Sequence, residues 1–324
     1  MKDVELKMIS RAKELLESGE VARVVGWKKG DFCFDPSPAT FTSVESLDEF
    51  VYDWFCGANL SKYLISVSKK EGKTAVFLKP CDTYSFNQLV KEHRIDREKV
   101  YVIAVECLAK LDIEKIKAKG VVGVTSVEVV DKEVKVTSAY GEETLVKEEV
   151  VLTKCATCNK THQVKDEEII LHERPMRDVN RFEEVEKLEA MTAEERFAFW
   201  KAQLSKCIRC NACRNVCPAC SCLKCVFDNP QSGISAKAND SEFEEKLFHV
   251  IRAFHVSGRC TDCGECSRVC PQNIPLHLLN RKFIKDIDTL YGEYQAGETA
   301  EGKTPLTSFT EGDKEPNDVL AEVK

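Results

Sequence analysis

The sequence has no long apolar run and no segment that resembles an export signal. No stretch approaches the roughly 18 uninterrupted apolar residues of a membrane-spanning helix, and Val100–Ala109 is as short as a buried strand. Residues 1–18 have the pattern of a charged amphipathic helix, so we expect no secretory signal peptide. We therefore predict a cytoplasmic protein without a membrane span, where thiols stay reduced.

Positive charge is also scarce, which argues against nucleic acid as a partner. The net charge is -7, and residues 291–324 contain eight acidic and three basic residues, so the rest of the chain hides no strongly basic face. No G-x-G-x-x-G follows an expected strand, and no arrangement of serine, cysteine and histidine suggests hydrolysis. The six histidines are scattered, and we expect His162, close to Cys158, to lie at the surface or cap a helix.

Cysteine, in contrast, is abundant, with 17 residues in 324. Residues 207–218 and 260–271 both have the pattern C-x2-C-x2-C-x3-C-P, which is typical of bacterial ferredoxins. Three cysteines spaced two residues apart lie on one tight loop, so their thiolates can bind three irons of one cluster. In two-cluster ferredoxins the fourth cysteine binds the other cluster. The spacing therefore predicts two [4Fe–4S] clusters whose ligands are exchanged between the loops.

Each predicted ligand set is numbered by the loop that supplies three of its four cysteines. The first set is Cys207, Cys210, Cys213 and Cys270, and the second set is Cys260, Cys263, Cys266 and Cys217. The alternative is a pair of structural zinc sites. Zinc needs only two cysteines per knuckle, which leaves the third cysteine and the proline of each run unexplained.

The pattern of apolar residues predicts an α/β domain with a mixed sheet, followed by a mainly helical 2[4Fe-4S] ferredoxin-like domain and an extended acidic C-terminal tail. The predicted bounds are 1–175 for the α/β domain, 176–206 for a helical connector, 207–290 for the dicluster domain and 291–324 for the tail. Within the connector, Thr192-x-x-Glu195 predicts a helix start by a capping box.

Individual elements are expected as follows. Strands are predicted at 21–27, 32–34, 74–79, 99–106, 121–130, 133–139 and 149–153. Helices are predicted at 46–53, 59–70, 82–93, 109–117, 241–255 and 276–291. The glycines of Gly120-Val-Val-Gly123 are expected to turn the chain into a hairpin.

Four more cysteines, the third set, follow predicted strands: Cys81, Cys107, Cys155 and Cys158. Ligands of open α/β sheets gather outside the carboxyl ends of the strands, so parallel strands would bring these thiolates together as a third [4Fe–4S] site. Asp82 and Thr83 are expected to cap the helix that follows Cys81. Alternatively, Cys81 and Cys107 are buried small hydrophobic residues, and Cys155-x-x-Cys158 is half of a zinc knuckle.

A last group follows the first ferredoxin run directly. Cys220, Cys222 and Cys225, with Cys56, could form a fourth site. Alternatively, Cys155 and Cys158 pair with two of these three residues. We expect Cys33 to be structural.

Several segments of the first 175 residues resemble the FrhB/FdhB family, the beta subunits of deazaflavin-coenzyme-reducing hydrogenases and formate dehydrogenases. They are Phe77–Asp82, Val105–Cys107 and Lys154–Cys158. The cysteine-rich half resembles iron–sulfur subunits of anaerobic hydrogenases, formate dehydrogenases and heterodisulfide-reductase-type flavoproteins, on Phe197–Trp200 and His255–Cys260. The resemblance implies FAD beside a cluster and hydride exchange with a deazaflavin coenzyme or a nicotinamide.

Together these features predict an electron-transfer subunit of an anaerobic oxidoreductase complex that is not catalytic alone. Its expected partners are a catalytic dehydrogenase or hydrogenase subunit and a flavoprotein. The alternative is a beta subunit that contains FAD and itself oxidises or reduces a deazaflavin coenzyme or NAD(P)H. Four arginines flank the cysteine loops, either as solvated charges or to offset cluster charge and dock an acidic partner: Arg209, Arg214, Arg259 and Arg268.

Overall fold

A computed structural model describes residues 1–159, 163–170, 179–232 and 242–308. The chain divides into two compact units. The first unit contains Met1–Phe86 and Ile95–Val179, and the second contains Asn87–Arg94 and Asn180–Lys324. Each unit is described by itself.

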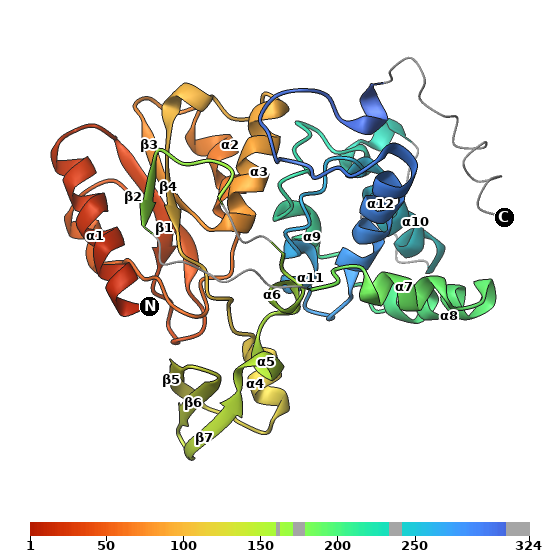
Figure 1. Cartoon of the computed structure of the whole chain (residues 1–324), viewed down its shortest axis with the longest axis horizontal. Helices are drawn as coiled ribbons and strands as arrows, with labels where there is room; N and C mark the ends of the chain where they lie inside the picture. The colour runs from red at the N-terminus through yellow and green to blue at the C-terminus, as the bar shows by residue number, and fades with distance from the viewer. Residues whose placement is uncertain (160–162, 171–178, 233–241, 309–324) are drawn as a thin grey trace. The chain divides into compact units, whose positions relative to one another are not determined.

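A five-stranded mixed sheet forms the centre of the first unit (Figure 1). Its strand order is β2-β1-β3-β4-β8, with β2 antiparallel to β1 and the remaining neighbours parallel. The strands are β1 (Arg23–Lys28), β2 (Ser37–Phe41), β3 (Thr74–Leu78), β4 (Val100–Val105) and β8 (Glu168–Ile170). Every residue of β3 is buried, as in parallel strands that are covered on both faces. The predicted mixed sheet is confirmed.

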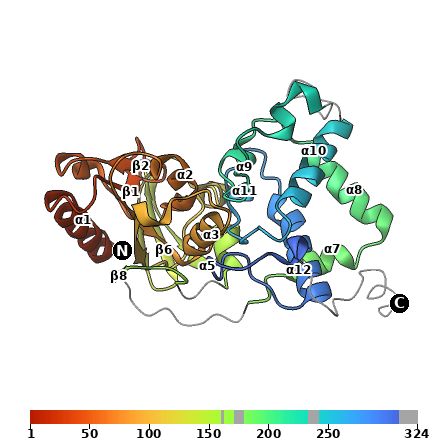
Figure 2. The same cartoon turned by 90° about the horizontal axis from the view of Figure 1, so that it is seen from above.

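Helices lie on both faces of this sheet (Figure 2). Helix α1 (Lys2–Glu17) contacts β1, β3 and β8 and buries Val4, Met8, Ala12 and Leu15, whose spacing places them on one helical face. Helices α2 (Leu64–Val67) and α3 (Pro80–Lys91) lie on the opposite face. Short 3-10 turns complete this part of the chain: η1 (Glu45–Glu49), η2 (Leu60–Tyr63) and η3 (Arg97–Lys99).

A second, smaller sheet of three antiparallel strands follows β4 in the chain. It contains β5 (Val124–Val130), β6 (Glu133–Ser138) and β7 (Gly141–Val146). Gly120 and Gly123 both have positive φ where the chain enters β5, so the expected turn is confirmed. The buried residues of β6 share a core with three short helices, α4 (Ile113–Ala118), α5 (Lys147–Val150) and α6 (Thr153–Ala156).

The second unit is mainly helical in its described residues. The longer helices are α7 (Glu183–Glu189), α8 (Ala193–Leu204), α10 (Glu242–His255) and α12 (Leu276–Tyr291). The shorter elements are α9 (Ala212–Asn215), α11 (Glu265–Arg268), η4 (Val226–Asp228), η5 (Pro230–Ser232) and η6 (Pro305–Thr307). Thr192 and Glu195 form the predicted capping box of α8, so that start signal is confirmed.

Two expected strands are wrong. Residues 32–34 form a turn, because the carboxylate of Asp35 accepts the backbone N–H of Phe32 at 2.9 Å. The partner of β1 is instead the Ser37–Phe41 strand, where Pro38 is tolerated because it lies at the edge of the sheet. Residues 149–153 form no strand of the large sheet, where the corresponding position is occupied by β8.

Three expected helices are shorter than predicted. Residues 46–53 contain only the 3-10 turn η1, and residues 59–70 contain η2 and the single turn α2. Residues 109–117 contain α4, which begins only at Ile113, where Asp112 caps it by accepting the N–H of Glu114.

The predicted extended tail is partly packed where the structure describes it. Gly292, with a φ of 87°, ends α12. After it, Ala296 and Thr304 are buried, 3% and 8% exposed. Residues 309–324 lie outside the described part of the chain. Among the described helices, none is both long enough and apolar enough to cross a membrane.

Candidate metal centres

The first ferredoxin loop is shaped by two residues in the left-handed region. Arg209 and Asn211 have φ values of 54° and 60°, which non-glycine residues rarely adopt. Asn211 precedes α9, so Cys213 becomes the second residue of that helix. The backbone N–H of Arg209 donates to the Sγ of Cys207 at 3.4 Å. Left-handed residues next to right-handed ones turn successive N–H groups into a concave anion-binding surface, a feature of many iron–sulfur sites.

The second loop repeats this backbone pattern. Asp262 and Gly264 have φ values of 58° and 66° at the equivalent positions. The backbone N–H of Asp262 hydrogen-bonds to Cys260 as that of Arg209 does to Cys207. Cys266 is the second residue of α11, which contacts α9. The two loops are thus copies in conformation as well as in sequence.

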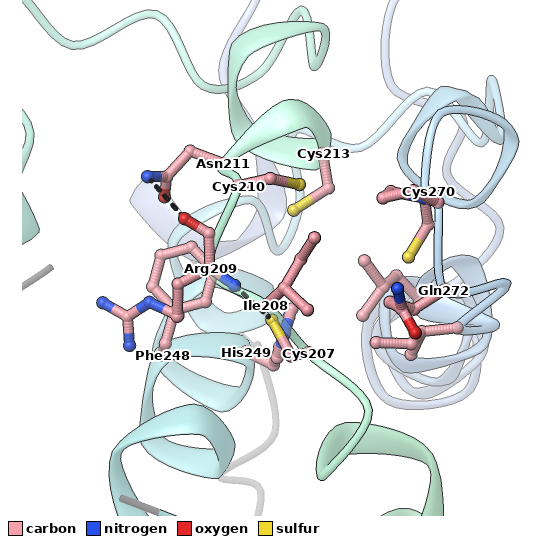
Figure 3. Close-up of a pocket in the computed structure, with 13 residues that line it drawn as sticks. Cys207, Ile208, Arg209, Cys210, Asn211, Cys213, Phe248, His249, Cys270 and Gln272 are labelled. Atoms are coloured by element: carbon pink, nitrogen blue, oxygen red, sulfur yellow. Dashed lines mark hydrogen bonds between the residues drawn. The ribbon is translucent and has the colours of Figure 1, made fainter. Parts of the chain in front are cut away.

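All four cysteines of the first set line one cavity, and their sulfur atoms face a common space (Figure 3). Cys270 comes from the second ferredoxin run, so the cavity combines residues of both runs. Thiolates that converge in this way, beside inward N–H groups, fit the ligand shell of a [4Fe–4S] cluster. The other residues around the cavity include Ile208, Phe248, His249, Pro271 and Gln272.

In the predicted exchange, the reciprocal member is Cys217. Its side chain packs in the same cluster as that of Cys260, and it interacts electrostatically with both Cys260 and Cys266 of the second set. A hydrogen bond from Cys220 is the main cause that lowers the pKa of Cys217 to about 5, against the opposing effect of burial. A thiol with a low pKa is readily present as the thiolate that binds iron.

The sequence analysis missed three buried polar side chains on α10: Glu245, His249 and Arg252. They are 4%, 1% and 3% exposed. Arg252 donates from Nη2 to the backbone oxygen of Cys213 at 3.2 Å and hydrogen-bonds to Cys266. Burial, followed by the nearby guanidinium groups of Arg252 and Arg209, lowers the pKa of His249 to about 3. The available signal was that these residues occupy the buried stripe of an amphipathic helix.

The four arginines named from the sequence are not free solvated charges. Each has a carboxylate partner within the second unit: Arg209 with Glu245, Arg214 with Asp228, Arg259 with Glu92 and Arg268 with Glu265. Much of their charge is therefore offset locally, whereas Arg252 hydrogen-bonds to cysteines of both ferredoxin runs.

In the first unit, the third set of cysteines lies together. Cys81 is the second residue of α3, and Cys107 follows β4, which runs parallel to β3. Cys155 interacts electrostatically with Cys107 and Cys158, and Cys81 also interacts with Cys158. Burial raises the pKa of Cys155 to about 11 and raises the pKa of Cys81 well above its usual value. Each of the four thiols thus interacts with at least one other, although the strand expected before Cys155 is absent.

Two lysines, the half-buried Lys154 and the buried Lys110, lie beside this group. Lys154 Nζ donates to the backbone oxygen of Gly57 at 2.7 Å and interacts with Cys81 and Cys155. Lys110 is 1% exposed, donates to the backbone oxygen of Asp53 at 2.6 Å and interacts with Cys107. Burial lowers the pKa of Lys110. Cations at these positions would offset the negative charge of a thiolate-ligated cluster.

The sequence led us to expect that Asp82 caps the helix after Cys81. In the structure, Asp82 lies inside the first turn of that helix and its carboxylate pairs with a lysine. Its Oδ2 is 2.7 Å from Nζ of Lys79, and the two side chains are 0% and 1% exposed. Thr83 instead donates its hydroxyl to the backbone oxygen of Pro80 at 2.8 Å. Helix α3 begins at Pro80, so this buried ion pair spans the turn that carries Cys81.

The remaining cysteines have separate environments. Cys56 is fully buried in the first unit, where its Sγ accepts from the Asp53 N–H at 3.3 Å and donates to the Asp53 carboxylate at 3.4 Å. In the second unit, Cys220 packs against the residues around Cys217, Cys222 is exposed and Cys225 packs against the core near Phe227. Cys33 is half-buried at the edge of a core. His162 lies outside the described residues.

Comparison with known proteins identifies the region that contains both ferredoxin runs. A family model described as a 4Fe-4S dicluster domain matches residues 203–274. The chain carries a 4Fe-4S dicluster domain.

Similarity to known proteins extends beyond the dicluster domain. An F420-dependent formate dehydrogenase subunit beta from Methanocaldococcus jannaschii is 25% identical over 339 aligned residues, which cover 86% of this chain and 88% of that protein. An F420-dependent formate dehydrogenase 1 subunit beta from Methanococcus maripaludis is 33% identical over 95 residues, 29% of this chain and 24% of that protein. The predicted resemblance to the FrhB/FdhB-like subunits is therefore confirmed.

A solved structure of the F420-reducing [NiFe] hydrogenase complex from Methanosarcina barkeri also matches. It has a TM-score of 0.39 and 14% sequence identity, and the match covers 49% of this chain and 62% of that one.

Proposed function

We propose that this protein is an iron–sulfur subunit of a multi-subunit oxidoreductase, and that it relays single electrons between a catalytic subunit and a flavoprotein. The observation that carries the proposal is the cavity lined by Cys207, Cys210, Cys213 and Cys270. It combines cysteines from both ferredoxin runs, which two independent zinc knuckles would not require. A bound [4Fe–4S] cluster accepts and releases one electron at a time.

The residues around the two loops suit this role. The thiolates of the first and second sets would hold the two clusters, and the N–H groups of Arg209 and Asp262 already hydrogen-bond to cysteine sulfurs. The buried side chains of Phe248 and Ile274 exclude water from part of the first cavity. A rigid, partly dry ligand shell of this kind needs little rearrangement when charge changes.

We further propose that the third set holds another [4Fe–4S] cluster in the first unit. The electrostatic contacts among its cysteines support this, as do the buried Lys110 and the half-buried Lys154 beside them. Cys220, Cys222 and Cys225 remain candidates for a fourth site. Cys56 is the weakest candidate ligand, because its thiol is engaged in hydrogen bonds within its own loop.

The second candidate function is that of a flavin-containing beta subunit that reacts with a deazaflavin coenzyme or NAD(P)H. The similarity to F420-dependent formate dehydrogenase beta subunits favours it. The first turn of α3 is the position where an α/β fold would bind the flavin pyrophosphate. That turn holds the carboxylate of Asp82, paired with Lys79, which disfavours a phosphate there.

The test is a preparation made without oxygen, with iron, sulfide and flavin counted per chain. We expect about eight irons for two clusters or about twelve for three, with iron-based EPR signals after dithionite reduction. Zinc in place of iron would refute the proposal. Stoichiometric FAD, with bleaching of the clusters by NADH or a reduced deazaflavin in the absence of partners, would instead establish the second function.

A further inference from the structure

Helix α10 buries polar groups on the face that an amphipathic helix normally fills with apolar side chains. Its buried residues follow the helical repeat and include Glu245, Phe248, His249, Arg252 and Ala253. Burying a charge is strongly unfavourable unless a partner compensates it. Three polar side chains on one buried stripe therefore indicate that this face of the helix contacts charged or polar groups of the dicluster domain.

Arg252 meets the cysteines of the dicluster domain. Its Nη2 donates to the backbone oxygen of Cys213 at 3.2 Å, and its guanidinium hydrogen-bonds to Cys266. Its strongest favourable electrostatic partner is Cys217, followed by Cys266. Both of these belong to the second set. The 3% exposure of Arg252 leaves little water to screen the interaction.

Besides the contact of Arg252 with Cys213, the first set meets two other residues of the same helix. The ligating atoms of Cys207, Glu245 and His249 lie within 4.8 Å of one another. Neither ring nitrogen of His249 has a hydrogen-bond partner among the described residues, and the side chain lines the first cavity (Figure 3). The carboxylate of Glu245 lies 3.7 Å from Arg209, which offsets its charge. The first cavity thus faces a neutral ring and an ion pair, and Arg252 reaches only its Cys213. The second set faces Arg252 through both Cys217 and Cys266, which are its stronger electrostatic partners.

We infer that Arg252 raises the reduction potential of the cluster held by Cys260, Cys263, Cys266 and Cys217 above that of its neighbour. The inference rests on the proposed function, because it requires clusters in both loops. Reduction adds one electron and no proton, and the guanidinium stays charged throughout. A fixed cation in a poorly screened site stabilises the reduced form more than the oxidised form. An electron that enters the dicluster domain is therefore held mainly by the cluster of the second set.

The experiment is a redox titration of the anaerobically prepared full chain, followed by EPR, on the wild type and on Arg252→Gln and Arg252→Lys. We expect the higher of the two midpoint potentials to fall in Arg252→Gln by at least about 59 mV, the shift that corresponds to a tenfold change in a one-electron equilibrium. The lower midpoint should move much less. Arg252→Lys keeps the charge and should retain most of the difference between the two midpoints.

Lys246→Gln is the matched control, since it removes one positive charge from the same helix at a half-buried position that stacks on Phe197. It should leave both midpoints in place. If Arg252→Gln fails to assemble clusters, Arg252→Met provides the same charge removal with an apolar chain that fits the buried site.

Iron content separates the possible failures. A wild-type protein without iron refutes the proposed function. Variants with a full iron content whose two midpoints are unchanged, or fall together, refute the role of Arg252 and leave the proposed function intact.

Discussion

Replacing Lys79 with methionine should strongly destabilise the first unit. In the structure its ammonium lies 2.7 Å from the Asp82 carboxylate, and the two side chains are 1% and 0% exposed. The same nitrogen donates to the backbone oxygen of Ala58 at 2.7 Å and lies 4.4 Å from the centre of the Trp27 ring. Methionine preserves the apolar stem but leaves a buried carboxylate without its cation.

The magnitude follows from that unpaired charge. Removing one partner of a buried ion pair costs about 3–5 kcal/mol, whereas replacing both partners with apolar residues is often nearly neutral. We therefore expect the single variant Lys79→Met to lose about 3–5 kcal/mol of unfolding free energy. The double variant Lys79→Met/Asp82→Leu should recover much of that loss. The difference between the two is the coupling energy of the pair.

Hydrogen exchange of the peptide that contains β3 measures this effect in the intact protein. A loss of about 3–5 kcal/mol corresponds to roughly two to four orders of magnitude in protection. The matched control is Lys28→Met, because Lys28 and Glu49 lie 2.8 Å apart with side chains 45% and 58% exposed, and exposed pairs contribute about 0–1 kcal/mol. Equal losses of protection in Lys79→Met and Lys28→Met would refute the argument. A double variant that is no more stable than Lys79→Met would refute it as well.

Three further predictions concern the second unit. Cys270→Ser should lower the iron content by about four atoms per chain, because it removes one ligand from the first cavity, whereas Cys33→Ser should lose none. Thr192→Ala should cost about 1 kcal/mol of unfolding free energy, measured by urea denaturation, because it removes the cap of α8. Burial, then Arg281, lowers the pKa of His277 to about 4, so the unit should lose up to about 3 kcal/mol as the pH falls from 6.5 to 4.

The sign of the last prediction follows from proton binding. Between pH 6.5 and 4 the unfolded chain binds a proton at His277 that the folded chain excludes, so acid favours unfolding and the stability is complete only above pH 6.5. The carboxylates of Asp262 and Glu184 oppose the shift without reversing it. His277→Asn should flatten the pH dependence over this range. An unchanged profile, an iron content unaffected by Cys270→Ser, or a Thr192→Ala variant as stable as the wild type would contradict the corresponding prediction.

Local patterns were sufficient where a short segment decides its own conformation. The capping box at Thr192 needs only the residues of one helical turn, and the hairpin of β5 and β6 follows from alternation and a polar turn. Long-range pairing was not accessible in this way. Residues 149–153 contain a short apolar run, and such a run does not distinguish a buried strand from a core-facing turn. Likewise, the strand expected at residues 32–34 lies a few residues before β2, the actual partner of β1. The position of such a strand is decided by its pairing at the edge of the sheet.

The cysteine spacing by itself predicted two ferredoxin-type loops, which lie in the matched dicluster domain, and an exchange of their fourth cysteines between the clusters. Such spacing constrains a tight loop directly, so a tertiary model was not needed to anticipate it. Only the tertiary structure decided what surrounds the thiolates. It brought Arg252 against Cys213 and Cys266 and paired Lys79 with Asp82 beside Cys81. The reason is physical: the energy of a buried charge depends on neighbours distant in sequence, and folding alone brings those neighbours together.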